Sequence, residues 1–148
     1  MPHTYVIAYY HVVFSTKNRL PTISAEVLPR LHAYLGGINR EHGGTAMSIG
    51  GVEDHVHLLL QVPSTLAIAK LVQLIKGGAS KWMNEQRVAG FAWQEGYGAF
   101  TIGQSQISDT RSYIEGQAEH HQHSTFQDEY RRFLVKHGIE WDEKYVWG

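Results

Sequence analysis

Apolar residues along the chain follow two patterns, one typical of strands and one typical of helices. Residues 5–14 are rich in β-branched and aromatic side chains, which predicts a strand. Two further strands are predicted over residues 45–52 and 53–62, the second of which is closed by Pro63. Between residues 91 and 102, aromatic residues interrupted by glycines indicate one or two short strands.

Four segments repeat apolar residues every three or four positions and are expected to be helices. They run from about Ser24 to Gly43, from Ser64 or Thr65 through Met83, from Ser108 or Asp109 to about His121, and from about Thr125 to Gly138. The element order is roughly βαββαβ followed by C-terminal helices. It favours an α+β fold, in which helices cover one face of an antiparallel sheet. The length of 148 residues favours one domain over residues 1–148.

The composition is that of an ordinary globular protein. With 43% hydrophobic and 18% charged residues, the chain is neither disordered nor fibrous. No apolar run approaches the ~20 residues that a membrane-spanning helix needs, and no signal peptide is recognisable at the start. The absence of cysteine excludes a disulfide scaffold, a cysteine-ligated zinc site, an iron–sulfur cluster and thiol catalysis. We therefore expect a cytoplasmic protein with no membrane partner.

Charge is distributed unevenly along the chain. The formal net charge is −1, but residues 1–100 carry +2 and residues 101–148 carry −3. Lys70 and Lys81 are eleven residues apart, or three helical turns, and therefore share a face of their predicted helix. Such a basic strip can follow the phosphates of a nucleic acid, although it can equally be a solvated helix face.

The sharpest candidate for chemistry is the pair His55 and His57 on the predicted strand 53–62. Alternate side chains of a strand share a face, so the apolar residues next to this pair point the other way, into the core. The two imidazoles would stand about 7 Å apart and could bind one metal ion together. Glu53 shares their face and could also reach the ion, whereas Asp54 is expected to make a turn or support the backbone. The alternative is a pair of surface histidines.

A second candidate constellation lies on the predicted helix over residues 108–121. Tyr113 and Gln117 are four residues apart and are neighbours on one face, which His120 and His121 continue. A phenol beside an amide ligand can deliver a nucleophile to a metal-bound phosphate, because a nearby cation favours the phenolate. The alternative is an amphipathic helix with a buried tyrosine that is hydrogen-bonded to an amide.

Taken together, these features resemble the single-tyrosine HUH transposases, small enzymes that move insertion sequences as single-stranded DNA. The resemblance covers almost the whole chain and depends on the order and spacing of several short stretches. These stretches are residues 13–19, residues 54–57, residues 93–97, Tyr113-Ile114 with Gln117 and His120-His121, residues 126–130, and the tail around Trp141 and Trp147. The resemblance implies a ferredoxin-like or RRM-like HUH fold, in which helices pack on a central antiparallel sheet and a C-terminal helix bears the tyrosine.

The resemblance also implies roles for individual residues. His55 and His57 would bind one divalent ion, Mg²⁺ or Mn²⁺, with Gln117 as the third protein ligand. Tyr113 would attack the scissile phosphate and form a 5′-phosphotyrosine link, and the reverse step would join strands without ATP. Members of the family are homodimers in which the tyrosine-bearing helix of one subunit can complete the histidine site of the other. They recognise imperfect single-stranded DNA hairpins near the ends of the element.

On this interpretation, five basic side chains are candidates for phosphate contacts: Lys17, Arg19, Lys70, Lys76 and Lys81. Two other functions stay open. One is a domesticated relative that binds nucleic-acid hairpins without cutting them, and the other is a replication or plasmid-transfer nicking enzyme with the same chemistry. The presence of all four proposed site residues speaks against the first, and the compact length speaks against the second.

Overall fold

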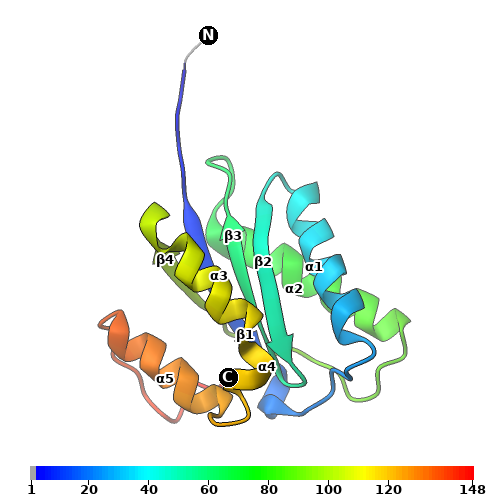
Figure 1. Cartoon of the computed structure of the whole chain (residues 1–148). Coiled ribbons are helices and arrows are strands. Elements are labelled where there is room, and N and C mark those ends of the chain that lie inside the picture. Colours follow the sequence, from blue (N-terminus) through cyan, green and yellow to red (C-terminus); the bar gives the residue numbers. More distant parts are fainter. Residues whose placement is uncertain (1–2) are drawn as a thin grey trace.

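The computed structural model describes residues 3–148 and shows a four-stranded antiparallel sheet in the order β2-β3-β1-β4 (Figure 1). The strands are β1 (Tyr9–Ser15), β2 (Thr45–Val52), β3 (His55–Gln61) and β4 (Gly98–Ile102). Every pair of neighbouring strands is antiparallel, so the predicted α+β class with a central antiparallel sheet is confirmed. A single domain over residues 1–148 stays a prediction, and its first two residues lie outside the described ones.

The helices cover both faces of this sheet, not the one face that the element order suggested. They are α1 (Leu28–Glu41), α2 (Ile68–Glu85), α3 (Ile107–Glu115), α4 (Gln117–His120) and α5 (Phe126–Lys136). The helices α1 and α2 lie on one face, and α3, α4 and α5 lie on the other (Figure 1). None of the helices within residues 3–148 combines the length and the apolar character needed to cross a lipid bilayer.

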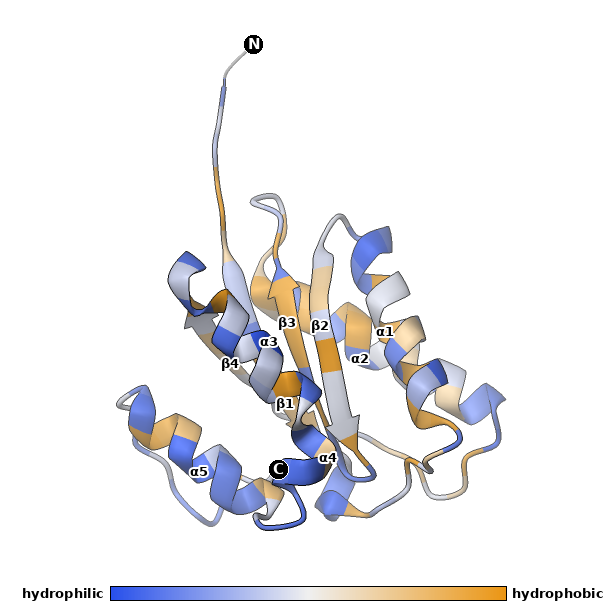
Figure 2. Cartoon of the chain, viewed as in Figure 1, coloured by the Kyte–Doolittle hydropathy of each residue, from blue (hydrophilic) through white to orange (hydrophobic). Residues whose placement is uncertain are grey.

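The larger core lies between the sheet and the helices α1 and α2. Phe14 of β1 and Leu58 of β3 point to this side, where they meet Leu35 of α1 and Ile75 of α2. A smaller apolar cluster on the opposite side joins Val13 of β1 to α5. Figure 2 shows the apolar residues concentrated on the central strands and the polar ones on α4 and α5. Because the central strands are buried on both faces, one layer of helices could not cover them.

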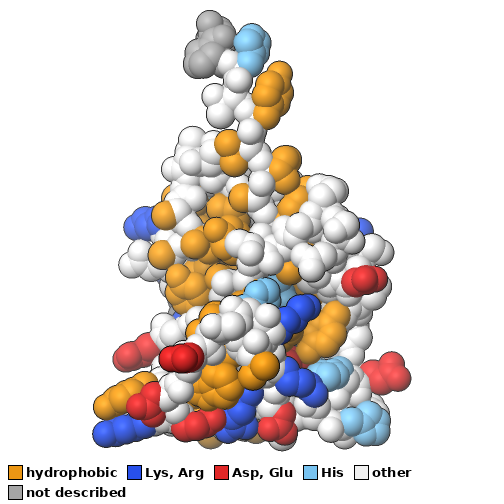
Figure 3. Space-filling model, turned by 90° about the vertical axis from the view of Figure 1, so that its left-hand side faces the viewer, with side chains coloured by type: hydrophobic (Ala, Val, Ile, Leu, Met, Phe, Trp, Pro, Cys, Tyr) orange, Lys and Arg blue, Asp and Glu red, His pale blue; other side chains and the backbone are white. Residues whose placement is uncertain are grey.

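The strand β1 begins at Tyr9 and not at residue 5. Both neighbouring strands end opposite Tyr9, so residues 3–8 have no strand beside them. Tyr5 is 89% exposed and Ile7 is 63% exposed. The segment runs away from the rest of the chain as an apolar extension (Figures 1 and 3).

Two further predicted elements are shorter than expected. The predicted helix over residues 108–121 is divided at Gly116, which has φ −90° and ψ 14° and separates α3 from α4. Glycine is among the poorest helix formers, which accounts for the break. Within residues 91–102 only β4 is a strand, while Trp93 makes an isolated bridge to Thr16.

The helix α3 packs unusually closely on β2 at Gly50. A Cβ atom built on Gly50 would lie 2.9 Å from Cγ2 of Ile114 and closer still to the carbonyl oxygen of that residue. Ile114 is fully buried and is the neighbour of Tyr113 in α3. The absence of a side chain at Gly50 therefore fixes how closely the tyrosine-bearing helix approaches the sheet.

We predict that Gly50→Ala destabilises the chain by about 1–3 kcal/mol, because the methyl group forces α3 away from β2. Urea denaturation of the two proteins measures the difference in the free energy of unfolding. The matched control is Gly77→Ala on α2, where an added Cβ meets no atom within 4 Å. This control should stabilise the chain by about 0.5–1 kcal/mol. Equal stability of Gly50→Ala and the unaltered chain would contradict the packing argument.

Candidate functional site

Three of the residues singled out in the sequence meet on the sheet face covered by α3, α4 and α5. His55 and His57 of β3 both point to this face and are fully buried there. Val56 and Leu58 point to the opposite core, as the alternation along the strand predicts. Oε1 of Gln117 in α4 lies 3.1 Å from Nε2 of His55. The predicted third ligand is therefore beside the histidine pair.

Tyr113 of α3 lies next to these residues. Its ring centroid is 5.8 Å from that of His57, and its hydroxyl is 3.4 Å from Nε2 of His120. The predicted relation to Gln117 survives the break at Gly116, because the Gln117 amide donates to the Tyr113 carbonyl at 3.3 Å. One chain thus brings the phenol and both histidines together.

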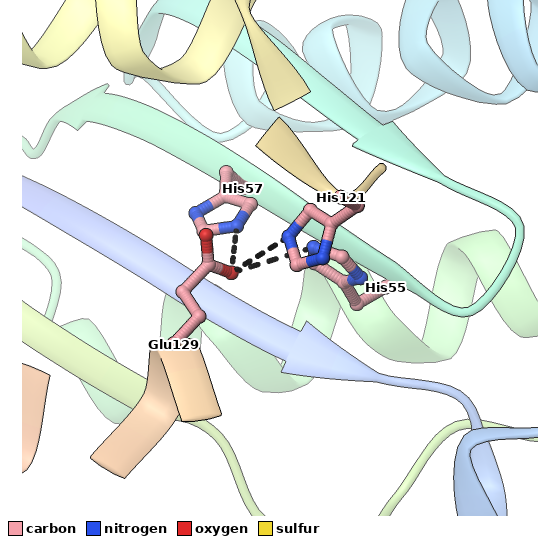
Figure 4. Close-up of side chains that lie close together, drawn as sticks. All are labelled: His55, His57, His121 and Glu129. Atoms are coloured by element: carbon pink, nitrogen blue, oxygen red, sulfur yellow. Dashed lines mark hydrogen bonds and ion pairs between the residues drawn. The ribbon is translucent and has the colours of Figure 1, made fainter. Parts of the chain in front are cut away.

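Glu129 of α5 lies at the centre of this group, although the sequence analysis did not single it out. Its Oε1 is 2.8 Å from Nε2 of His57, 3.2 Å from Nε2 of His121 and 3.5 Å from Nε2 of His55. Figure 4 shows the carboxylate directed at the three imidazoles, which come from β3 and from the end of α4. We call these four residues the imidazole–carboxylate cluster.

The second oxygen of Glu129 faces the tyrosine. Oε2 accepts a hydrogen bond from the Tyr113 hydroxyl and lies 3.2 Å from Nε2 of His120. The Glu129 side chain is only 1% exposed, so its charge is compensated by these neighbours and not by solvent. The two carboxylate oxygens therefore connect the imidazoles to the phenol.

Asp54 orients His55 from the far side of the ring. Its carboxylate accepts a hydrogen bond from Nδ1 of His55 at 2.7 Å, which is the usual support for a metal-binding histidine. The expected turn position of Asp54 is confirmed, and its carbonyl also accepts from the Thr16 amide at 2.8 Å, but the contact of its side chain with His55 was not expected. Because β3 begins at His55, Asp54 and Glu53 lie in the turn before it, outside the strand alternation. Glu53 is exposed and is not part of the cluster.

His11 of β1 supports His57 in a similar way. Nε2 of His11 lies 2.7 Å from Nδ1 of His57, and the two rings stack with centroids 5.0 Å apart. Burial lowers the pKa of His57 to about 4 and that of His11 to about 3. Both imidazoles are therefore neutral at pH 7, the form in which histidine binds metal ions.

The remaining titratable groups set the charge of the cluster. Burial alone would raise the pKa of Glu129, but the imidazoles of His121 and His57 hold it well below its usual range. Burial alone would lower the pKa of His121, but the Glu129 carboxylate raises it. Burial and Glu129 together raise the pKa of Tyr113 well above its usual value. The site thus holds a buried negative charge, attracts positive charge and keeps its phenol protonated.

The donor atoms of the cluster fit a divalent cation. One atom from each of the four residues, three imidazole nitrogens and a carboxylate oxygen, lies within 4.8 Å of all the others. Neutral imidazole and carboxylate are common protein ligands for divalent ions. The sequence analysis proposed two members of this set as ligands and placed His121 on the same helix face as Tyr113, but Glu129 becomes evident only in the structure.

A cavity of about 360 Å³ opens beside the tyrosine. Tyr113, His120 and Glu129 line it together with Arg132 and Lys136 of α5. The sequence analysis did not single out these two basic residues, since nothing local marks which face of α5 turns to the tyrosine. They can hold an anionic group such as a phosphate next to Tyr113.

None of the five basic residues proposed for phosphate contacts lines this cavity. Lys70 and Lys81 are exposed on α2, which covers the sheet face opposite the histidines. Lys17 is exposed after β1. The Arg19 guanidinium donates to the carbonyl of Trp147 at 3.3 Å and lies over the ring of the same residue. Contacts between these residues and DNA stay predictions.

Lys76, the fifth basic residue, has a structural role. Its Nζ donates to the carbonyls of Gln94, Glu95 and Gly96 at 2.6, 3.1 and 2.8 Å, and it lies 5.3 Å from the centre of the Phe14 ring. A lysine ammonium has three hydrogens, and all of them are used here. Lys76 therefore holds the loop before β4, and its expected contact with phosphate stays a prediction.

The matches to known proteins are consistent with this fold. A family model described as "Transposase IS200 like" matches residues 4–117. The ISDra2 transposase TnpA of Deinococcus radiodurans is 28% identical over 115 residues, which cover 73% of this chain and 82% of the relative. The transposase of insertion sequence element IS200 from Salmonella typhimurium is 25% identical over 127 residues, which cover 80% of this chain and 82% of the relative.

Two solved structures have a similar fold. A crystal structure of a Deinococcus radiodurans R1 protein described as a transposase has a TM-score of 0.62 and 26% identity, and the match covers 79% of this chain and 96% of that one. The REP-associated tyrosine transposase bound to a REP hairpin has a TM-score of 0.57 and 13% identity, with 77% and 68% covered. The fold and the sequence matches define the class of protein, which is the DNA transposases. This chain belongs to the IS200-like transposase family.

We predict that Lys76→Ala lowers the free energy of unfolding by about 2 kcal/mol or more, because three carbonyls lose a charged donor. The exposed Lys81→Ala on the same helix is the matched control and should stay within about 0.5 kcal/mol of the unaltered chain. Urea denaturation at neutral pH measures both. Equal losses from the two variants would show that the lysine–carbonyl contacts do not stabilise the loop.

Proposed function

We propose that this chain cleaves and rejoins single-stranded DNA at insertion-sequence ends through a 5′-phosphotyrosine intermediate, with Tyr113 as the nucleophile. The observation that supports this most directly is the position of the Tyr113 hydroxyl. It lies between the imidazole–carboxylate cluster and a cavity that two basic side chains also line. A phosphodiester in that cavity would meet both the phenol and the basic side chains of Arg132 and Lys136.

The reaction needs no energy source beyond the DNA itself. The Tyr113 oxygen attacks phosphorus, a tyrosine–phosphate bond forms, and the bond from phosphorus to the 3′ oxygen breaks. The phenol loses its proton and the 3′ oxygen takes one up, leaving a free 3′-hydroxyl. Strand transfer reverses these steps at another DNA end, so one phosphodiester bond replaces another and no ATP is consumed.

His55, His57 and Gln117 are the residues proposed to hold a divalent cation, Mg²⁺ or Mn²⁺. When bound, the cation supplies neutralisation and orientation of the phosphate charge. Asp54 and His11 hold the two imidazoles with their Nε2 atoms turned to the site. Burial keeps His57 neutral at pH 7, so no proton has to leave this ring before it can serve as a ligand.

We propose imperfect single-stranded hairpins near the element ends as the DNA partner. The family membership supports this, and so does the likeness in fold to the REP-associated enzyme, whose structure contains a REP hairpin. Such DNA lies in the nucleoid of a prokaryotic cell, which would place the protein in the cytoplasm. Exposed Lys17, Lys70 and Lys81 stay candidates for contacts with the hairpin backbone.

The resemblance also leads us to propose a homodimer, for which sharing of the sites between subunits was expected. In this chain Tyr113 is hydrogen-bonded to Glu129, which contacts His57 of the same chain. A single chain therefore holds every side chain that the proposed chemistry needs. We propose that each site works with the tyrosine of its own subunit.

We predict that Tyr113→Phe abolishes the covalent protein–DNA adduct, a loss of about 10⁴-fold or more in cleavage, because the nucleophilic oxygen is removed. A single-stranded element end labelled at its 3′ terminus is incubated with protein and Mn²⁺ and run on a denaturing gel. The exposed Tyr145→Phe is the matched control and should form the adduct normally. An adduct that persists in Tyr113→Phe would place the nucleophile elsewhere, and no adduct from the unaltered chain would reject the function.

We predict that mixing Tyr113→Phe with His57→Ala protein restores no cleavage, because neither variant contains an intact site within one chain. The same labelled DNA end serves as the substrate, and each variant alone is the baseline. Activity that appears only in the mixture would instead show that tyrosine and histidines of different subunits work together.

A further inference from the structure

We propose that Glu129 and His121 are further protein ligands of the cation, so that three imidazole nitrogens and one carboxylate oxygen join the Gln117 oxygen around it. This inference rests on the proposed function, in which Tyr113 is the nucleophile. The cation site itself can be tested without DNA. Both residues lie outside residues 4–117, the stretch that the family model matches. The proposal is therefore drawn from the geometry of this chain.

The hydrogen bonds on the far side of the rings determine which nitrogens carry free lone pairs. Nδ1 of His55 faces the Asp54 carboxylate at 2.7 Å, and Nδ1 of His121 faces the Ser124 carbonyl at 2.7 Å. Both partners are acceptors, so each Nδ1 carries the hydrogen. In the neutral ring, Nε2 then has a lone pair and no hydrogen to donate.

These lone pairs point at other acceptors. Nε2 of His121 is buried and has no hydrogen-bond partner within residues 3–148, although Oε1 of Glu129 is 3.2 Å away. Nε2 of His55 faces the same oxygen at 3.5 Å and Oε1 of Gln117 at 3.1 Å. Electron-rich atoms this close repel each other unless a proton or a metal ion lies between them. Without a metal ion, a proton on Nε2 of His121 compensates the Glu129 carboxylate, and a divalent cation can take its place and bind the other donor atoms as well.

The spacing of these atoms also agrees with a coordination shell. Two adjacent ligands of an octahedral ion, each about 2.1 Å from it, are about 3.0 Å apart. Oε1 of Glu129 lies 2.8, 3.2 and 3.5 Å from the nitrogens of His57, His121 and His55. Small movements of buried side chains, already fixed by partners behind them, would suffice to admit the ion.

The ligand set indicates which ions are preferred. Imidazole favours first-row transition ions, whereas Mg²⁺ prefers oxygen ligands and retains water. A site with three imidazoles should therefore select Mn²⁺, Co²⁺ or Zn²⁺ over Mg²⁺. Oε2 of Glu129 meanwhile accepts the hydrogen bond from Tyr113, so one side chain would contact both the ion and the nucleophile.

The test is a titration of the full chain with Mn²⁺, in which electron paramagnetic resonance measures the free ion. We predict that Glu129→Gln and His121→Ala each weaken binding by about 10-fold or more. The matched control is Asp128→Asn, since Asp128 is the neighbouring acid on α5 and its side chain is 63% exposed. It should stay within about 2-fold, and an approximately 100-fold excess of Mg²⁺ should leave Mn²⁺ bound. Circular dichroism confirms that each variant is folded.

The outcomes separate this inference from the proposed function. If Glu129→Gln binds Mn²⁺ normally while His57→Ala does not, the carboxylate ligand is overturned and the histidine site stands. Tighter binding by Glu129→Gln would show that the carboxylate occupies the ion's place, which also overturns the proposal. If the unaltered chain binds no Mn²⁺, both the further ligands and the metal dependence of the proposed function fail.

Discussion

The buried carboxylate of Glu129 is the interaction on which the site depends. A carboxylate that is 1% exposed is costly to bury unless its neighbours compensate the charge. Here the compensation comes from His57 on β3, His121 after α4 and Tyr113 on α3. These contacts tie α5 to the sheet and to α3 and α4. The same contacts therefore compensate the charge of Glu129 and hold α5 against the rest of the chain.

The second constraint is the burial of β3 on both faces. On one side its residues form part of the main core, and on the other the same strand carries two fully buried histidines. Polar rings in such a position need partners, and Asp54 and His11 supply them. These partners fix the orientation of each ring and leave Nε2 directed at the site. A rigid central strand thus serves as the platform for the chemistry.

Patterns that span only a few residues correctly predicted which side chains share a face of a strand or a helix. Strand alternation predicted that His55 and His57 share a face, and helical spacing predicted that Tyr113 and Gln117 are neighbours. The α+β class followed from the element order, although the number of helical layers did not. Those predictions succeeded because strand and helix geometry are local and regular.

Contacts between distant parts of the chain could not be predicted in this way. Glu129 is 72 residues from His57 in the sequence. The residues next to it in the sequence do not show that its carboxylate is buried beside histidines. The contact of Asp54 with His55 was missed because the strand begins two residues later than expected, which removes Asp54 from the alternation. The structural role of Lys76 was not predicted, because the three carbonyls that bind it belong to a loop 18 to 20 residues further on.

The position of α5 in the chain has a consequence for newly made protein. Chains leave the ribosome from the N-terminus, so the sheet and the tyrosine-bearing helix are synthesised before Glu129. A nascent chain that already has its histidine pair and its phenol still lacks the carboxylate that joins them. The contacts that join the phenol to the imidazoles are therefore completed only after α5 has been synthesised and has docked.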